Sequence, residues 1–448
     1  MTTTDTNDVP PLSSVDELVA EFQSACKPAA QWRVGTESEM IGAYAEPPEL
    51  GKAPPYEGDR GIGALLSRIA EAGWSPVREN GNAIALASGD TQITLEPGGQ
   101  LELAARPVDA AADTEAYLLA YERVVADASR DLGIAWLGLG FRPLGGLEDV
   151  PWMPKRRYSI MREYLPTRGK LAHEMMKRTS TVQVNLDFAD AGGAAEKLRA
   201  AMSVTSIMTA IYANSPIVDG ALSDYQSYRA HVWHHTDPDR CGLLRFAFED
   251  GDIFRAYAEY ALDVPMFFVH RGDYLPVGGM TFRQFMAEGF DGARATMEDW
   301  ELHLSTLFPE ARIKRFMEIR GCDGGTRDMV LALAPLCRGL FYDADARASA
   351  TALTAGLDFD QRQTLSEDVA RRGLRAGAGA HAVGELAKQL VAIADDGLGR
   401  TAPSERRYLE PLREIVETGR TRADIAADAW RAADGDPIAA IRCFRRFA

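Results

Sequence analysis

The sequence predicts a protein of the α+β class, with an antiparallel sheet, surrounding helices and a helical C-terminal region. Short alternating strand patterns separated by turn residues crowd the first third of the chain, and two helical patterns interrupt them. Further strands alternate with helices up to about residue 325, beyond which Ala-, Arg- and Glu-rich helical patterns dominate. The expected divisions are a mobile tail, a main domain and a helical region packed on it, at residues 1–14, 15–325 and 326–448.

The N-terminal part supplies the first helix and a meander of strands. The first fourteen residues are almost all polar, and a helix is expected to begin near Val15. Turn residues at Ser88-Gly89-Asp90 and Pro97-Gly98-Gly99 separate the last three of four strand patterns. These strands are expected at residues 32–39, 82–88, 91–96 and 100–105, and helices at about Ile62–Ala72 and Ala110–Leu132.

The middle of the chain adds more strands and a long helix. Strands are expected at residues 181–188, 243–248 and 315–320. A helix over Ala194–Ala213 stops at Asn214-Ser215-Pro216. In the helical C-terminal part, the Ala- and Gly-rich residues 375–384 are expected to form a loop.

Charge and cysteine content limit the kind of protein that this is. The 65 acidic residues outnumber the 49 basic ones, and the net charge of −16 disfavours nucleic acid and anionic membranes as partners. The five cysteines are scattered without a CxxC pair. No apolar run reaches the roughly 20 residues of a membrane span. We therefore expect a soluble protein of the reducing cytoplasm.

Several familiar catalytic motifs are missing from the sequence. It contains neither GxxxxGK[ST] nor GxGxxG, the signatures of phosphate-binding loops. HExxH and GxSxG, typical of zinc proteases and serine hydrolases, are missing as well. The residues that remain for chemistry are carboxylates on predicted strands.

Polar residues recur two apart on these strands, which places them on one face of each strand. Glu37 and Glu39 share a face from which their neighbours point away. The Pro-Gly-Gly turn brings Glu96 back toward Gln100 and Glu102.

Two later strands repeat the pattern. At residues 181–188 the apolar positions alternate with Thr181, Gln183, Asn185 and Asp187, so one face is core and the other carries oxygen and amide groups. In the strand at 315–320, Glu318 and Arg320 point the same way.

If these faces converge, four or five carboxylates share a small volume and require a cation. Two like charges about 4 Å apart repel by roughly 4 kcal/mol at an effective dielectric of 20. Mg²⁺ or Mn²⁺ with oxygen ligands meets that need, and Mg²⁺ on carboxylates usually serves substrate phosphates, which points to ATP. The alternative is a set of solvated sheet faces. Four acidic or neutral faces without interspersed lysines favour convergence.

Together these segments resemble the plant-type glutamate–cysteine ligases, a family also found in many proteobacteria that makes γ-glutamylcysteine for glutathione biosynthesis. The resembling segments keep the family's order over about residues 32–325. They are Val34–Glu39, Leu95–Leu103, Met153–Tyr158, Thr181–Phe188, Tyr212–Pro216, Arg229–Trp233, Ala261–Met266 and Glu318–Arg320. The resemblance implies a glutamine-synthetase-like fold, a curved antiparallel sheet that cradles ATP and metal ions.

The resemblance also implies a role for each conspicuous residue. Arg229 and Arg320 would bind the glutamate carboxylate and the transferring phosphoryl group. Trp233 would lie near the amino-acid substrates. The implied nucleotide-binding residues are Lys155, Asn185 and Lys314. The implied metal ligands, which the strand alternation also selects, are Glu37, Glu39, Glu96, Glu102, Gln183 and Glu318.

The implied reaction is that of an ATP-dependent carboxylate–amine ligase with small-molecule substrates, glutamate and most simply cysteine. The γ-carboxylate attacks ATP to give γ-glutamyl phosphate, and an amine then attacks the activated carbonyl. The protein needs no nucleophile of its own, because positioning and electrostatic stabilisation carry the catalysis. A phosphotransferase on the same fold and a non-catalytic nucleotide-binding regulator are alternatives.

A few residues depart from the family or suggest other chemistry. Arg327 and Arg338 lie in two segments that carry aromatic residues in the family. They could therefore recruit an acidic or larger amine as acceptor in specialised metabolism. His231, His234 and His235 have an unusual spacing for zinc and are interpreted as structural or substrate-lining. The cysteines are interpreted as free thiols.

Overall fold

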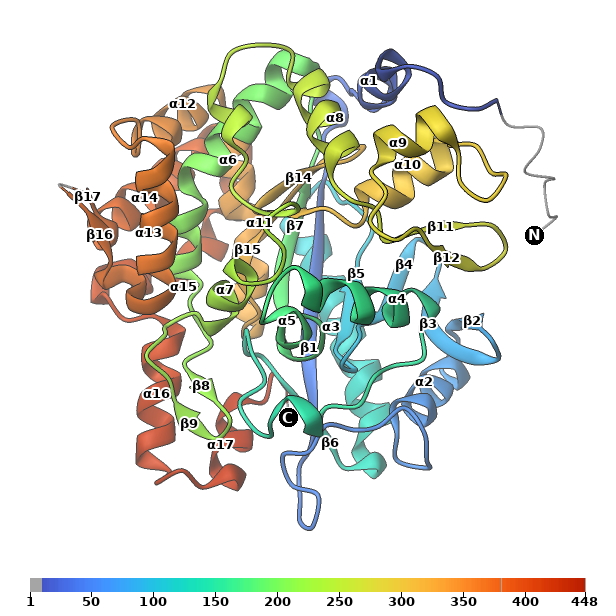
Figure 1. Ribbon diagram of the computed structural model, residues 1–448. Helices are drawn as coiled ribbons and strands as arrows, with labels where there is room; N and C mark the ends of the chain where they lie inside the picture. Colours follow the sequence, from blue (N-terminus) through green and yellow to red (C-terminus); the bar gives the residue numbers. More distant parts are fainter. Residues whose placement is uncertain (1–9, 380, 448) are drawn as a thin grey trace.

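A nine-stranded antiparallel sheet forms the centre of the computed structural model, which describes residues 10–379 and 381–447 (Figure 1). The strand order is β14-β15-β7-β1-β5-β4-β3-β2, and β6 pairs with the far half of β1. The strands are β1 (Val34–Tyr44), β2 (Ser75–Glu79), β3 (Asn82–Ser88), β4 (Thr91–Leu95), β5 (Leu101–Ala104), β6 (Ile134–Leu137), β7 (Thr181–Leu186), β14 (Ala311–Ile313) and β15 (Met317–Asp323).

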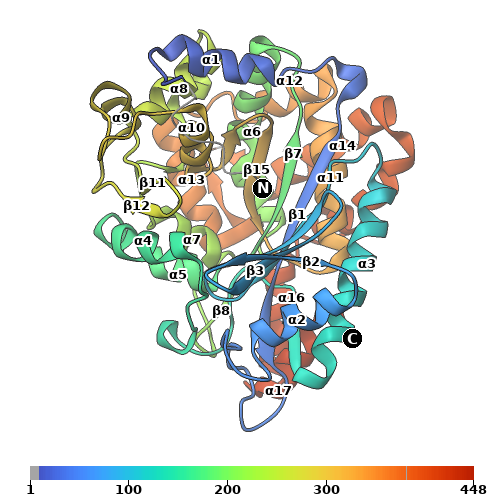
Figure 2. The same cartoon turned by 90° about the vertical axis from the view of Figure 1, so that its right-hand side faces the viewer.

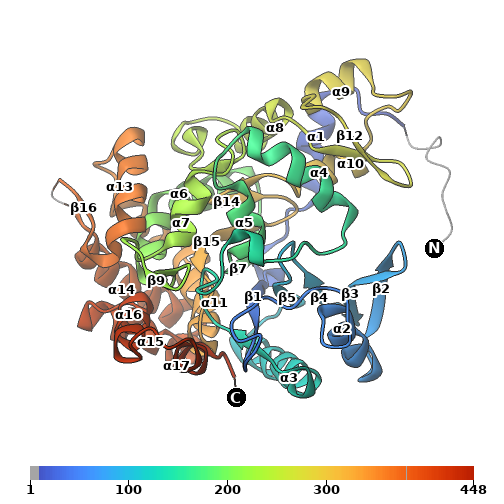
Figure 3. The same cartoon turned by 60° about the horizontal axis from the view of Figure 1, so that its bottom comes forward.

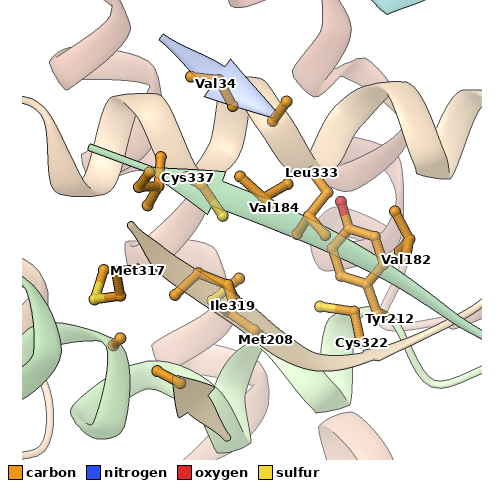
Figure 4. Packing of buried hydrophobic residues seen from close by; sticks show 14 of the residues in the cluster. Val34, Val182, Val184, Met208, Tyr212, Met317, Ile319, Cys322, Leu333 and Cys337 are labelled. Atoms are coloured by element: carbon orange, nitrogen blue, oxygen red, sulfur yellow. The ribbon is translucent and has the colours of Figure 1, made fainter. Parts of the chain in front are cut away.

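Three long helices lie on one side of the sheet, where the first two pack on its strands and the third packs on those two. These are α6 (Ala191–Ile211), α11 (Arg327–Phe341) and α14 (Val383–Thr401), which lie on the same side of β7 and β15 in Figures 1 and 2. Val184 of β7 meets Leu333 and Cys337 of α11 in a buried apolar layer (Figure 4). The apolar half of the β7 alternation therefore faces the core, as the sequence predicts.

The opposite face of the sheet carries the polar half of the alternation and faces three shorter helices. These are α4 (Arg156–Tyr164), α5 (Ala172–Arg178) and α7 (Tyr228–His234), which lie across β1 and β7 in Figure 3. A cavity remains between these helices and the sheet.

The remaining elements surround these layers. The other helices are α1 (Val15–Ser24), α2 (Ile62–Glu71), α3 (Ala111–Ser129), α8 (Ile253–Asp263), α9 (Phe282–Glu288), α10 (Met297–Leu304), α12 (Ala344–Ala352), α13 (Phe359–Arg372), α15 (Glu410–Thr418), α16 (Arg422–Ala432) and α17 (Pro437–Phe444). Four two-stranded pieces pair β8 (Ile217–Val218) with β9 (Ala221–Leu222), β10 (Cys241–Gly242) with β13 (Phe308–Pro309), β11 (Phe268–His270) with β12 (Tyr274–Pro276), and β16 (Gly377–Ala378) with β17 (His381–Ala382). Within the described part of the chain, no helix combines the length and apolarity that a bilayer crossing requires.

Local signals explain most element boundaries. Ser14 caps α1, and its hydroxyl accepts a hydrogen bond from the Glu17 N–H, so the helix begins at Val15 as expected. The strand expected at residues 243–248 is wrong, because Arg245–Phe248 form a 3-10 turn. Arg199 donates to the carbonyls of Ala247 and Glu249, so a side chain takes the place of a sheet partner there.

Two further expectations meet the structure only in part. Of the expected tail, residues 1–9 lie outside the described residues, whereas Leu12 is buried and its N–H donates to the carbonyl of Ala295. The expected loop at 375–384 contains the short strands β16 and β17, and α14 begins at Val383, inside it.

Candidate active site

Cross-strand pairing brings the predicted polar faces together. In the antiparallel register Glu39 lies opposite Glu102, and Glu37 lies opposite Gln183. Glu318 lies opposite Asn185 one row further along. Side chains that are directly opposite on neighbouring strands share a face and lie about 5 Å apart at Cβ. The carboxylates of three strands and the amides of a fourth therefore converge, as the sequence argument requires.

The converging residues line one cavity of about 310 Å³, near the lower end of the size range of small-molecule sites, about 300–1,000 Å³. Asn185 is the one predicted site residue that does not line it, but its Nδ2 donates to Glu37 Oε1 at 2.8 Å. The predicted residues on the cavity wall are Glu37, Glu39, Glu96, Glu102, Lys155, Gln183, Arg229, Trp233, Lys314, Glu318 and Arg320.

Three of the glutamates lie in the cavity without a strong cation partner. Burial, Glu318 and Glu102 raise the pKa of Glu37 to about 7. Burial and Glu96 likewise raise the pKa of Glu102 to about 7, although the Thr94 hydroxyl donates to it. Burial and neighbouring glutamates also raise the pKa of Glu39 well above its usual range. The cluster therefore resists full ionisation unless positive charge is added.

Glu318 is the exception, because three cations surround it. Burial alone would raise its pKa, but Arg312, Lys314 and Arg320 outweigh burial and hold the pKa well below the usual range. The Glu318 carboxylate lies 2.5 Å from Arg312 Nη2 and 2.7 Å from Arg320 Nη1. Arg320 Nη1 also donates to Gln183 Oε1 at 2.6 Å.

Helix α7 presents Arg229 and Trp233 to the cavity. The ring centroid of Trp233 lies 5.8 Å from the guanidinium carbon of Arg229 and 5.8 Å from that of Arg320. Nε of Arg229 and Nε1 of Trp233 are buried and have no hydrogen-bond partner among the described residues. A buried donor without an acceptor costs free energy. Both groups are therefore suited to donate a hydrogen bond to an anionic or carbonyl oxygen of a ligand.

Asp323 at the end of β15 holds α7 in place. Its carboxylate accepts hydrogen bonds from the hydroxyls of Ser215 and Ser227 at 2.6 and 2.7 Å, and from the Asn214 N–H at 2.8 Å. Ser227 is also the N-cap of α7, because its side chain accepts from the Ala230 N–H. One buried carboxylate thus connects the sheet to the helix that carries Arg229.

Helix α4 supplies the cation at the other end of the cavity. Lys155 precedes the helix, and its Nζ lies 3.4 Å from the Tyr158 hydroxyl. That hydroxyl donates to the carbonyl of Leu95 at 2.8 Å and lies 3.4 Å from Glu96 Oε1. Burial lowers the pKa of Lys155, and Glu96 opposes that shift.

The comparison with known proteins identifies the family. A sequence model of glutamate-cysteine ligase family 2 matches residues 33–441. The chain belongs to that family. It is 40% identical over 428 residues to the chloroplastic glutamate–cysteine ligase of Brassica juncea, covering 94% of this chain and 82% of that protein. The chloroplastic enzyme of Arabidopsis thaliana is 39% identical over 428 residues, covering 94% and 81%.

A solved structure supports the fold of this glutamate–cysteine ligase family member. The glutamate–cysteine ligase of Francisella tularensis in complex with AMP aligns with a TM-score of 0.57 at 12% identity, covering 93% of this chain and 89% of that chain. The likeness confirms the expected fold class. Family membership confirms the resemblance that the motifs carried, and with it the expectation of a ligase acting on small molecules.

The expectation of a cytoplasmic location is wrong by the same comparison, because these relatives of the family member are named chloroplastic. It was based on scattered cysteines and on the lack of a long apolar run. Neither feature distinguishes one compartment from another.

The acceptor residues suggested by the departures from the family are not in the cavity. Arg327 pairs with Glu122 at 2.6 Å, and Arg338 pairs with Glu405 at 3.1 Å. Neither lines the cavity, so neither is placed to recruit an acidic amine. His231 stacks on Tyr225 with ring centroids 4.2 Å apart, on the outer side of α7, which fits a structural role.

Sequence reasoning missed several cavity residues. Arg312 lies on the three-residue strand β14, which is too short to show an alternation, but the spacing of Arg312 and Lys314 could have indicated it. Most of the other missed residues come from α4 and α5, where no strand period applies, whereas Thr94 lies on β4 and Phe308 on β13. The missed residues include Thr94, Arg157, Tyr158, Met161, Met175, Met176, Phe308 and Arg312.

Proposed function

We propose that this family member joins the γ-carboxylate of glutamate to the amino group of cysteine, using ATP and Mg²⁺, with Mn²⁺ as a possible substitute. The observation that supports this best is that one cavity holds carboxylates without strong cation partners together with Arg229, Arg320 and Trp233. The glutamates suit a metal–nucleotide, and the guanidinium groups suit anionic substrates.

The proposed metal ligands fit a hard divalent cation by the chemistry of their donors. All six are oxygen donors, and the raised pKa values of Glu37 and Glu102 mark where added positive charge would be most favourable. Within the described residues no three His, Cys, Asp or Glu side chains form a ready-made metal group, so the ligands must draw together around an ion. To bind the ion, Glu318 and Gln183 would first have to give up their contacts with Arg320. When bound, Mg²⁺ would offset the charge of the triphosphate. The proposed ligands are Glu37, Glu39, Glu96, Glu102, Gln183 and Glu318.

The proposed nucleotide contacts come from the two ends of the cavity. Lys155 and Lys314 line its wall, and burial lowers the pKa of both, so an anionic phosphate that stabilises their charged form would be bound favourably. Asn185 would act through Glu37, whose carboxylate it orients by a hydrogen bond.

The proposed reaction proceeds in two steps. The glutamate γ-carboxylate attacks the γ-phosphorus of ATP, ADP leaves, and γ-glutamyl phosphate forms. The amine of cysteine then attacks the acyl carbon, phosphate leaves, and the amine nitrogen loses a proton. Arg229 would hold the substrate carboxylate, and Arg320 would stabilise charge on the moving phosphoryl group. Trp233, next to both, would exclude water from the acyl phosphate.

Cysteine is proposed as the acceptor because neither of the two arginines that favoured a larger or acidic amine lines the cavity. Arg327 and Arg338 are engaged with Glu122 and Glu405 outside the cavity. The cavity wall on the α5 side instead carries Met175 and Met176, which suit a small, soft side chain.

The test is ADP release with glutamate plus each of several amines, followed by mass spectrometry of the product. We expect ADP release that requires both glutamate and cysteine, and a product equal to their sum less one water. No ADP release with this pair would refute the proposal. A phosphorylated product that accumulates without an amide would instead identify a phosphotransferase.

A further inference from the structure

The chain ends in an extended segment that adds to the edge of β6. Arg445 pairs with Leu137 as an antiparallel bridge, and the N–H of Arg446 donates to the carbonyl of Trp136 at 2.9 Å. We call Arg445 and Arg446 the C-terminal latch. Figure 1 shows α17, the helix that precedes the latch, beside β6. The latch lies beyond residues 33–441, which the family model matches.

The latch inserts one side chain behind the strand that carries two of the cavity glutamates. The Arg446 side chain is completely buried. Its Nε donates to Glu122 Oε1 at 2.9 Å, and its Nη1 donates to Ser38 Oγ at 2.8 Å. Ser38 lies between Glu37 and Glu39 on β1, so it points away from the cavity while they point into it.

The contacts of Arg446 are a poor arrangement for stability alone. Glu122 already pairs with Arg327 at 2.6 Å, so two guanidinium groups share one carboxylate. Nη2 of Arg446 is buried without a hydrogen-bond partner among the described residues. Replacing a whole buried ion pair by apolar side chains is often neutral or stabilising, so the pair with Glu122 is weak evidence that Arg446 is present for stability. What the arginine does provide is a fixed contact on the back of β1.

We infer that Arg446 is a positioning residue, which holds Ser38 from behind and thereby fixes the rotation of β1 that aims Glu37 and Glu39 into the cavity. The same network reaches Arg327 at the start of α11, directly after the segment that carries Glu318 and Arg320. The inference rests on the proposed function, because it assigns Glu37 and Glu39 to a nucleotide-bound cation.

The first test is Ser38→Ala in the full chain, which removes one hydroxyl and no charge. We expect the KM for Mg-ATP to rise about tenfold, because misplacing catalytic groups by about 1 Å can cost up to about a hundredfold in rate. Tm should fall as well, because the buried Nη1 of Arg446 loses an acceptor. The Tm increase that Mg-ATP causes should shrink in parallel, and this second readout needs no turnover. An unchanged KM and an unchanged Mg-ATP shift would overturn the inference.

The second test is Arg446→Met, with Arg445→Met as the matched control. Arg445 is the exposed neighbour in the same latch, so its replacement should leave KM for Mg-ATP unchanged. Arg446→Met should raise KM as Ser38→Ala does, and the double variant should show little further increase, because the two residues act through one contact. A lower Tm with an unchanged KM would mean a structural role only and would overturn the inference.

The outcomes separate this inference from the proposed function. If the wild-type chain releases no ADP with glutamate and cysteine, the proposed function fails whatever the variants do. If the wild-type chain is active but Arg446→Met behaves like Arg445→Met, the inference alone fails. Arg446→Lys should be intermediate, because one ammonium group cannot replace the guanidinium fork toward both Ser38 and Glu122.

Discussion

At the scale of single residues, the cavity is organised by which carboxylates have cations and which do not. Glu318 has three, whereas Glu37 has the amide of Asn185 and two acidic neighbours. A buried carboxylate held among like charges contributes little to stability, so Glu37 is a candidate for another purpose, the binding of a cation.

Glu37→Gln tests that purpose. We expect turnover to fall by at least about a hundredfold, because a proposed metal ligand is lost. The free energy of unfolding should fall by no more than about 1 kcal/mol, or should rise, because the substitution removes a buried charge that neighbouring glutamates repel. ADP release and thermal unfolding measure the two effects, with the exposed Glu71→Gln as control. Full activity of Glu37→Gln would contradict its assignment as a ligand.

The raised pKa values of Glu37 and Glu102 predict how stability depends on pH in the absence of metal. Both groups have an ordinary pKa of 4.5 and a folded pKa of about 7. Between those values the folded protein binds more protons than the unfolded chain, so this contribution to stability is present below pH 4.5 and is lost as pH rises through about 7. Urea unfolding across this window should show the decline.

The same pH dependence should weaken in two ways. Glu37→Gln should flatten it, because one of the titrating groups is gone. Mg²⁺ with ATP should also flatten it, because a bound cation keeps the carboxylates ionised, and binding near pH 6 should release protons. A slope that is the same with and without Glu37 would show that other groups cause it.

The sequence predicted single residues well where a strand period applied and poorly where it did not. Glu39 and Gln183 were found because alternation fixes which way a strand side chain points. Arg327 was misplaced as an acceptor residue because its partner, Glu122, lies 205 positions away in the chain. Only the folded structure shows such a pairing.

At the scale of elements, turns decide where strand carboxylates end up. The turn at Gly98 lies against α5, where an added Cβ would come within 2.0 Å of the Lys177 carbonyl oxygen. Glycine therefore allows the turn to approach α5, which closes one side of the cavity and positions Glu96. The sequence indicated this turn by composition, but it could not show which helix the turn contacts.

Gly98→Ala should consequently impair both folding and activity. We expect a loss of about 1–3 kcal/mol in unfolding free energy, because the backbone must move to relieve the clash. We also expect kcat/KM to fall at least about tenfold as Glu96 shifts.

Gly89→Ala, in the preceding turn of the meander, is the matched control. Gly89 has a φ of +58° and nothing within 4 Å of an added Cβ. Its replacement should cost about 1 kcal/mol in stability through the left-handed backbone alone, without changing kcat/KM. Equal losses of activity in both variants would mean that the contact with α5 does not position Glu96.

At the scale of the whole molecule, the expected boundary near residue 325 does not coincide with a gap in the core. Helix α11 begins just after it, and twelve of its fifteen residues are buried. Leu333 and Cys337 of this helix pack on Val184 and Val34, the core side of the strands that carry the cavity residues (Figure 4). The division into a sheet-bearing part and a helical region packed on it stays a prediction, and sequence patterns could not show which side chains the two parts share in one apolar core.

A chain of residues 1–325 should therefore not fold alone. Without α11, the apolar face of β7 and β1 would be exposed, and each large side chain returned to water costs about 1.5–3 kcal/mol. That loss exceeds a typical domain stability of about 5–15 kcal/mol once several such side chains are exposed. We expect no cooperative urea transition and strong binding of a hydrophobic dye. Co-expression with residues 326–448 should restore cooperative unfolding and ADP release, because the two parts complete one core. Cooperative unfolding of residues 1–325 by themselves would contradict this, and would mean that the helical region is an accessory to a sheet stable on its own.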